Sequence, residues 1–187
     1  MRLGWMALAG LLAAAPAAGQ TGLALEVRGG ASAGNYAAAA SDFEVAPKPA
    51  FGATLSYAVT PMIGVYAGYS RSSFGCDTGF CTDRDMTFTS AGVDAGVRLA
   101  LPLGPVSPWV RAGVVSHSLG YDGTMENGET RQGDGDGSVG FEAGGGVQIN
   151  LGRRLAVTPG VRYVRYGSAG EDGVAMVVGD VGLVFRM

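Results

Sequence analysis

The feature that most constrains this chain is a strict alternation of apolar residues with polar or small ones. Period two puts successive side chains on opposite faces of a β-strand, so each such stretch predicts a strand with one apolar face. Strands of about ten residues have the length at which a tilted strand crosses a bilayer. Eight alternating stretches recur, at about residues 23–28, 51–59, 63–70, 90–99, 109–115, 141–150, 155–163 and 180–186.

The connections between these strands alternate in length. Long polar connections are expected at 33–49, 72–86, 119–137 and 166–173, and short ones at 60–62, 101–107 and 152–154. Long loops at one end and tight turns at the other are typical of outer-membrane barrels, in which the turns face the periplasm.

Charge separates the two faces of every predicted strand. All nine charged residues within the strands lie on the face opposite the apolar one: Glu26, Arg28, Asp94, Arg98, Arg111, Glu142, Arg162, Asp180 and Arg186. A soluble barrel would also separate its faces, with the charged one outward. Here the charged face is rich in glycine and other small residues instead of the long lysines and glutamates of a solvated surface, which favours an inward position.

The large aromatic residues of the apolar face lie near strand ends. Phe51, Tyr69, Phe141 and Tyr163 lie toward the long loops, whereas Tyr57 and Phe185 lie toward the turns. Aromatic rings prefer the two membrane interfaces, and a water-soluble core would instead place its largest rings in the middle. Between the rings the apolar face carries mainly Ala, Val, Leu and Gly. The sequence therefore predicts an all-β, eight-stranded, antiparallel, transmembrane up-and-down β-barrel.

The first residues have the features of an export signal. Arg2 precedes an apolar stretch from about Leu3 to Ala15, and small residues before Gln20 suit cleavage. We therefore expect a signal peptide over residues 1–19 and one barrel domain over residues 20–187, exported through the periplasm. No later window is apolar for 18 residues, which argues against a membrane-spanning helix.

The last strand must meet the first. An open sheet edge in lipid leaves backbone groups unpaired, at several kcal/mol each. The stretch DVGLVFRM is therefore expected to pair with the first strand, around Leu23 to Gly30, and so abolish both edges.

The signal, the eight strands and the alternating connections resemble the OmpA/OmpX-type family of eight-stranded outer-membrane barrels over essentially the whole mature chain. The resemblance implies a monomer in the bacterial outer membrane. It also implies that the barrel-assembly machinery recognises the last strand, where Val181, Leu183 and Phe185 fit the alternating signal and Met187 departs from its usual terminal aromatic residue. No periplasmic peptidoglycan-binding domain is expected after the last strand.

Eight strands enclose a space that side chains can fill. The five arginines and four carboxylates named above are therefore expected to form an ion-paired plug, because unpaired buried charge is costly. A narrow gated pore, in which the pairs exchange partners, is the alternative. No cofactor and no metal are predicted.

Cys76 and Cys81 in FGCDTGFC are expected to form a disulfide, because the periplasm is oxidising and the two lie close in a turn-prone loop. Zinc would need further ligands, and His117 is the only histidine. The acidic, glycine-rich third loop suggests calcium only weakly, since no glutamate stands at the required spacing. It is expected to be a solvated loop.

His117 stands between Ser116 and Ser118, which raises the alternative of a lipid A-modifying enzyme. Adjacent strand residues point to opposite faces, so His117 cannot meet either serine, and it is expected to line the outer mouth of the barrel. Pro159 lies within a strand and removes a ladder donor; a bulge near the turn side is one interpretation, which the sequence leaves open.

Arg71 and Arg165 continue the outward face just beyond Tyr69 and Tyr163, where they could bind lipopolysaccharide phosphates. Without Arg2 the chain has 13 − 1 = 12 basic against 16 acidic residues, which gives no basic surface for nucleic acid. The sequence predicts a structural or adhesive role, with loops that contact an unknown extracellular partner. A narrow solute channel is the alternative, and a lipid A-modifying enzyme is less favoured.

Overall fold

The computed structural model describes residues 22–36, 47–76, 85–124, 130–134, 137–167 and 173–187. Among these residues there is no helix of the length and apolarity needed to cross a bilayer. Their regular structure is a set of strands: β1 (Gly22–Tyr36), β2 (Pro47–Ala58), β3 (Ile63–Cys76), β4 (Asp85–Ala100), β5 (Val106–Thr124), β6 (Thr130–Asp134), β7 (Ser138–Asn150), β8 (Leu155–Tyr166) and β9 (Val174–Arg186).

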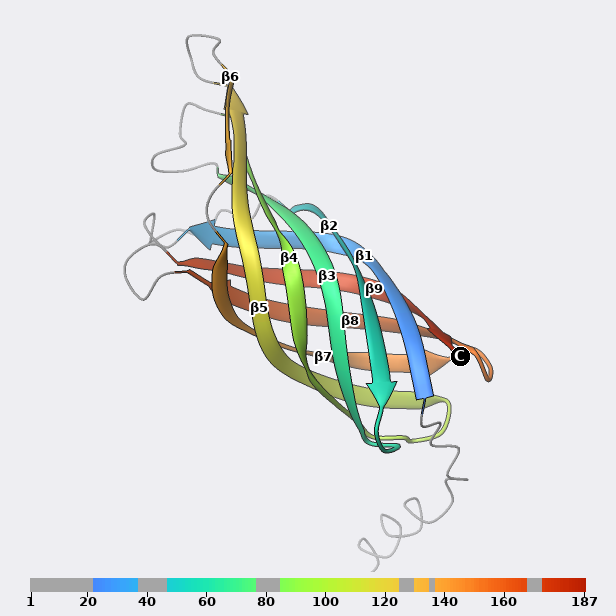
Figure 1. Ribbon diagram of the computed structural model, residues 1–187. Helices are drawn as coiled ribbons and strands as arrows, with labels where there is room; N and C mark the ends of the chain where they lie inside the picture. The colour runs from blue at the N-terminus through green and yellow to red at the C-terminus, as the bar shows by residue number, and fades with distance from the viewer. Residues whose placement is uncertain (1–21, 37–46, 77–84, 125–129, 135–136, 168–172) are drawn as a thin grey trace, which may run out of the picture.

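Eight of these strands form a closed antiparallel barrel (Figure 1). Their order is β4-β3-β2-β1-β9-β8-β7-β5, and pairing of β4 with β5 closes the ring. The predicted union of the last strand with the first is present, running from Ala24 opposite Arg186 to Tyr36 opposite Val174. The predicted fold class is therefore confirmed. The chain ends at the turn end of the barrel, beside the start of β1 (Figure 1).

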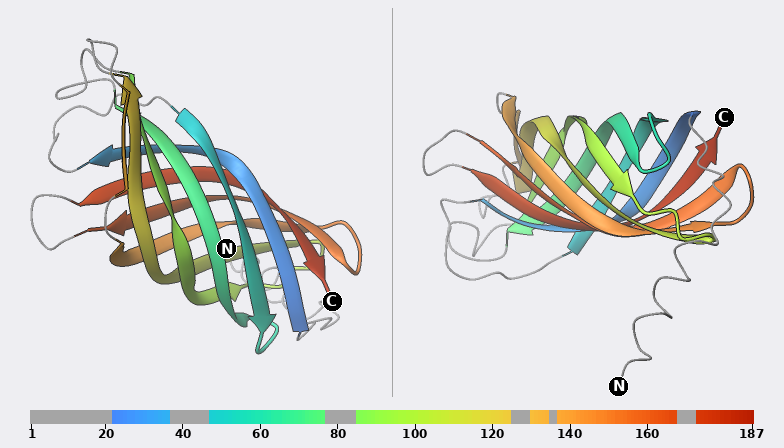
Figure 2. Two further views of the ribbon diagram at one scale, coloured as in Figure 1. Left: turned by 45° about the horizontal axis from the view of Figure 1, so that its top comes forward. Right: turned by 90° about the horizontal axis from the view of Figure 1, so that it is seen from below.

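The strands tilt against the long axis of the barrel (Figure 2). The outer face of the barrel is apolar. Valine and leucine side chains such as Val93, Val110 and Leu183 are exposed on that face. Six aromatic side chains of the outer face are between 37% and 54% exposed: Phe51, Tyr57, Tyr69, Phe141, Tyr163 and Phe185. In water such a surface would drive aggregation, so its natural solvent is lipid.

The strands are longer at the loop end than the alternation of the sequence predicts. β1 continues to Tyr36, β3 to Cys76 and β5 to Thr124, all within stretches that were expected to be loops. The third connection also contains β6, which pairs only with β5 and rises with it beyond the barrel (Figure 1). The polar stretches were expected to be loops because they lack an apolar outer face. Outside the bilayer the outer face of a strand meets water and can be polar, so the strands continue to pair there.

The pairing of β8 decides the question of a bulge at Pro159, and no residue is inserted there. Pairing of β7 with β8 is interrupted between Gly146 opposite Gly160 and Ile149 opposite Val157, but both pairs belong to one register. On the other side of β8, Pro159 still lies opposite Val181. The missing N–H of proline therefore costs local ladder bonds to β7 without inserting a residue.

Glycines on the inner face make room for large side chains. A β-carbon added at Gly113 would lie 2.5 Å from the hydroxyl oxygen of Tyr66, and closer still to the carbonyl oxygen of Ala95. A β-carbon added at Gly96 would lie 2.7 Å from the same oxygen. The phenol of Tyr66 can therefore cross the interior only because both neighbouring positions lack a side chain.

This close approach can be tested by substitution. Gly113→Ala should destabilise the folded barrel by about 1–3 kcal/mol, because Tyr66 or the backbone of β4 must shift. Gly179→Ala is the matched control, since its β-carbon would meet nothing within 4 Å. Urea unfolding in detergent micelles measures both. Equal midpoints for the two variants would show that the contact at Tyr66 does not limit packing.

Candidate functional site: the interior of the barrel

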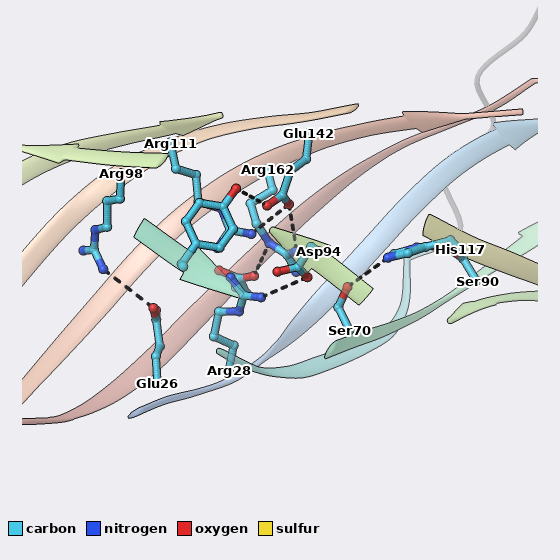
Figure 3. Close-up of polar contacts among 12 residues, drawn as sticks. Glu26, Arg28, Ser70, Ser90, Asp94, Arg98, Arg111, His117, Glu142 and Arg162 are labelled. Carbon is cyan, nitrogen blue, oxygen red and sulfur yellow. Dashed lines mark hydrogen bonds and ion pairs between the residues drawn. The ribbon is translucent and has the colours of Figure 1, made fainter. Parts of the chain in front are cut away.

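The centre of the interior holds a cluster of ion pairs drawn from opposite walls. Glu142 on β7 accepts hydrogen bonds from Tyr66 on β3 at 2.5 Å and from Arg111 on β5 at 2.9 Å. Arg162 on β8 lies 3.5 Å from the same carboxylate, and its Nε donates to Asp180 on β9 at 2.9 Å. Five strands are thus tied together across the lumen (Figure 3).

A looser pair lies beside this cluster. A guanidinium nitrogen of Arg28 is 3.9 Å from a carboxylate oxygen of Asp94, beyond hydrogen-bond distance. Both oxygens of Asp94 and the hydroxyl of Thr54 are buried and accept or donate no hydrogen bond within the described part of the chain. This corner of the interior is therefore less tightly held than the part around Glu142.

The turn end holds a separate and more open group. Glu26 lies 3.7 Å from Arg98 and accepts a hydrogen bond from Thr158 at 2.6 Å. The guanidinium of Arg98 lies over the ring of Trp109, 4.6 Å from its centroid. The side chain of Arg98 is 16% exposed, against 4% or less for the arginines and carboxylates of the centre.

Arg186 also belongs to this group. It donates to the side-chain oxygen of Asn150, which accepts a second hydrogen bond from Gln148 at 3.1 Å. Gln148 in turn accepts from Arg98 at 3.2 Å. Two arginines are thus joined through neutral amides. Trp109, Gln148 and Asn150 were not predicted as site residues, although alternation along the strands already places them on the inner face.

The loop end is closed by apolar side chains, which the sequence analysis missed. The cluster consists of Ala50, Phe74, Val115, Val164, Tyr166, Val174, Met176 and Val178, with Phe88 and Leu119 packed against it. The rings of Phe74 and Phe88 stack with centroids 5.5 Å apart. On the outer face at this end, Arg71, Ser116 and Arg165 are exposed. Polarity therefore reverses along the barrel, because the strands leave lipid and enter water.

His117 does not line an open mouth, contrary to expectation. It is buried at the level of the apolar cluster, with Nδ1 2.9 Å from the hydroxyl of Ser90 and Nε2 3.5 Å from that of Ser70. Its ring lies 5.4 Å from that of Tyr166. Ser116 and Ser118, its neighbours in sequence, are exposed on the outer face. The serines that reach His117 come from β3 and β4, and no local spacing could reveal them.

The remaining predicted residues lie on the outer face or beyond the described segments. Tyr163 packs against Phe141, with ring centroids 6.1 Å apart. Cys76 ends β3, but Cys81 and the acidic tip of the third loop lie outside the described residues, as does the expected signal peptide. The disulfide, the calcium alternative and the cleavage of residues 1–19 therefore stay predictions.

A closed antiparallel barrel with an apolar outer face and a charged interior defines a β-barrel membrane protein. The chain belongs to the family described as outer membrane protein beta-barrel domain, whose model matches residues 5–185. This confirms the resemblance to outer-membrane barrels and places the protein in the bacterial outer membrane. No curated protein matches the chain significantly in sequence.

Solved structures with the same fold include three outer-membrane proteins. Neisserial surface protein A has a TM-score of 0.64 at 14% identity, over 89% of this chain and 98% of that one. Ail of Yersinia pestis, solved with the heparin analogue sucrose octasulfate, has a TM-score of 0.56 at 14% identity, over 89% of this chain and 100% of that one. OprG of Pseudomonas aeruginosa has a TM-score of 0.54 at 12% identity, over 90% of this chain and 98% of that one. At these identities the likeness concerns the fold alone.

The central cluster makes a sharp prediction about stability. Glu142→Gln keeps the side-chain shape but leaves Arg111 and Arg162 without their shared counter-charge, so the barrel should lose about 3–5 kcal/mol. Tyr66→Phe removes one hydrogen bond to a charged group and should cost less, about 1.5–3 kcal/mol. Both are measured by urea unfolding in micelles.

Arg165→Gln serves as the control, because an exposed charge should change stability by no more than about 0.5 kcal/mol. If Glu142→Gln unfolds at the same urea concentration as this control, the carboxylate does not hold the interior together.

Proposed function

We propose that the protein is a closed outer-membrane barrel with a structural or adhesive role at the cell surface. The observation that carries this proposal is that the interior is filled at two levels. The ion-paired cluster around Glu142 occupies the centre, and the stacked rings of Phe74 and Phe88 lie closer to the loop end. A solute that crossed the barrel would have to break charge pairs and also part an apolar layer.

The part of the barrel beyond the lipid supports a contact role for its loop end. β5 and β6 form a hairpin at the loop end, and β4 pairs with the other side of β5 up to Asp85 opposite Thr124 (Figure 1). By the rule for barrels of this class the long-loop end faces outward from the cell. A partner would meet this end first, as the sequence analysis expected for an unknown extracellular partner.

A narrow channel is the second candidate, and one observation favours it. Arg162 lies within ion-pair distance of both Glu142 and Asp180, so it already shares its charge between two carboxylates. The pair Arg28–Asp94 is loose enough to exchange partners. A channel would use such an exchange at the centre, but it would also need a path through the apolar layer.

For His117 we propose a structural role and no enzymatic one. Its two serine contacts are buried on the inner wall, away from lipid on the outer face. Within the described part of the chain, no carboxylate accepts a hydrogen bond from its ring to orient it as a base.

Conductance separates the closed barrel from the channel. Purified protein in planar bilayers should show no steady openings, because two independent layers block the lumen. The double variant Phe74→Ala/Met176→Ala should also stay closed, since the ion pairs remain in place. A known porin in the same bilayer is the positive control. Persistent nanosiemens channels of the unaltered protein would establish the second candidate instead.

Arg71 and Arg165 support contact with lipopolysaccharide, since both are exposed on the outer face just beyond Tyr69 and Tyr163. Lipopolysaccharide added to micelles should raise the temperature at which the folded band is lost on a heat-modifiability gel. Arg71→Gln/Arg165→Gln should lose at least half of that rise. Arg153→Gln, at the turn end, should keep it. An unchanged rise in the double variant would exclude these two arginines.

A further inference from the structure

The turn end of the barrel interior has more positive charge than its carboxylates can balance. The described interior carries five arginines and four carboxylates. Three of each meet at the centre, and Glu26 pairs with Arg98. Arg186 is left as the one arginine of the described interior with no carboxylate within ion-pair distance.

The two arginines at this end are held in place by neutral side chains. Arg98 donates to Gln148, and Arg186 donates to Asn150, while Gln148 and Asn150 bond to each other. Asn150 is fixed in turn by donating to the backbone oxygen of Gly104 at 3.1 Å. A guanidinium has five N–H donors, and within the described residues only Asn150 accepts one from Arg186. The guanidinium of Arg186 therefore has further N–H donors, held in position, that can bind a ligand.

This group is open to solvent from the turn end. Arg186, Gln148 and Asn150 are half-buried, and Arg98 is more exposed than any arginine of the centre. Figure 3 shows the pair Arg98–Glu26 set apart from the central cluster along the interior. The apolar cluster closes the opposite end, so a ligand would enter and leave on the periplasmic side.

The surrounding surface adds to the positive potential. Arg153 and Arg154 are exposed in the turn between β7 and β8, and the backbone of Arg154 accepts from the amide of Arg186. The other two turns, residues 59–62 and 101–105, contain no charged residue. Apart from Glu26 and the terminal carboxyl group of Met187, described acidic groups are absent from this end. Such a field raises the local concentration of anions.

We propose that the turn end of the lumen is a binding site for an oxyanion, formed by Arg98 and Arg186 and positioned by Gln148 and Asn150. The ligand is a phosphate or carboxylate group, whose paired oxygens match the planar fork of donors on a guanidinium. It occupies the periplasmic mouth and does not need to cross the barrel. The site therefore stands whether or not the barrel conducts.

Trp109 provides the signal for a test, because the guanidinium of Arg98 lies on its ring. The chain has two tryptophans, so the substitution Trp5→Phe in the full chain leaves Trp109 as the only tryptophan, which is excited selectively at the red edge of its absorption. Sodium phosphate is titrated into the protein in zwitterionic micelles at pH 7, with sodium chloride keeping the ionic strength constant. The fluorescence of Trp109 should change and saturate.

The variants identify the residues responsible. Arg186→Gln should raise the phosphate midpoint at least tenfold, whereas the control Arg165→Gln, on the outer face at the opposite end, should change it less than twofold. Asn150→Asp places a carboxylate beside Arg186 and should abolish the response while the barrel stays folded, as judged by heat-modifiability. If Arg186→Gln does not fold, the variant Asn150→Asp still tests the site. A response that never saturates, or that survives both Arg186→Gln and Asn150→Asp, overturns the proposal.

A second arm identifies the source of the oxyanion. The titration is repeated in nanodiscs of phosphatidylcholine, with and without phosphatidylglycerol. If the anionic lipid shifts the phosphate midpoint upward and Asn150→Asp removes that shift, the ligand is a headgroup of the inner leaflet. If the midpoint is the same in both, the ligand is a free anion. Both results support the site, and absence of any saturable change in either nanodisc overturns it.

Discussion

Backbone hydrogen bonding in lipid is the constraint on which the rest of this structure depends. A strand in a bilayer has no water to satisfy its N–H and C=O groups, so the sheet must close on itself. Closure is complete here because β9 pairs with β1 along its length. A ring of eight strands encloses a narrow interior, and that interior has to be filled by whatever the inner face carries.

The inner face fills this space in layers of different chemistry. Charges occupy the centre, where Glu142 draws Arg111 and Arg162 together and so compensates the cost of their burial. Apolar rings occupy the loop end, where the outer face is already in water and the usual rule of an apolar inside applies again. The turn end keeps half-buried arginines in reach of solvent. One barrel thus combines the inside-out pattern of a membrane protein with the ordinary pattern of a soluble one.

Glycine makes these layers possible. Side chains as large as Tyr66 and Trp109 cross an interior that would otherwise be too narrow for them. Gly96 and Gly113 border the phenol, while Gly146 and Gly160 lie against the indole, where an added β-carbon would come within 2.9 Å of the ring. The abundance of glycine in this chain therefore has a packing explanation on the inner wall, in addition to its use in loops.

Much of the fold was readable from the sequence, because side-chain alternation is local and lipid imposes it on every strand. Period two predicts which residues, from Glu26 to Arg186, carry charge on the inner face, and it predicts aromatic positions such as Tyr69 on the outer one. The pairing of the last strand with the first follows from the need to leave no sheet edge open in lipid. Tertiary structure alone decided which charges meet, since Tyr66 and Glu142 are 76 residues apart in sequence. It also decided that His117 contacts Ser70 and Ser90, and that Phe74 closes the loop end. Those contacts join different strands, either across the lumen or between neighbours in the sheet. Their distances are set by strand register and barrel closure, which no spacing along the sequence reveals.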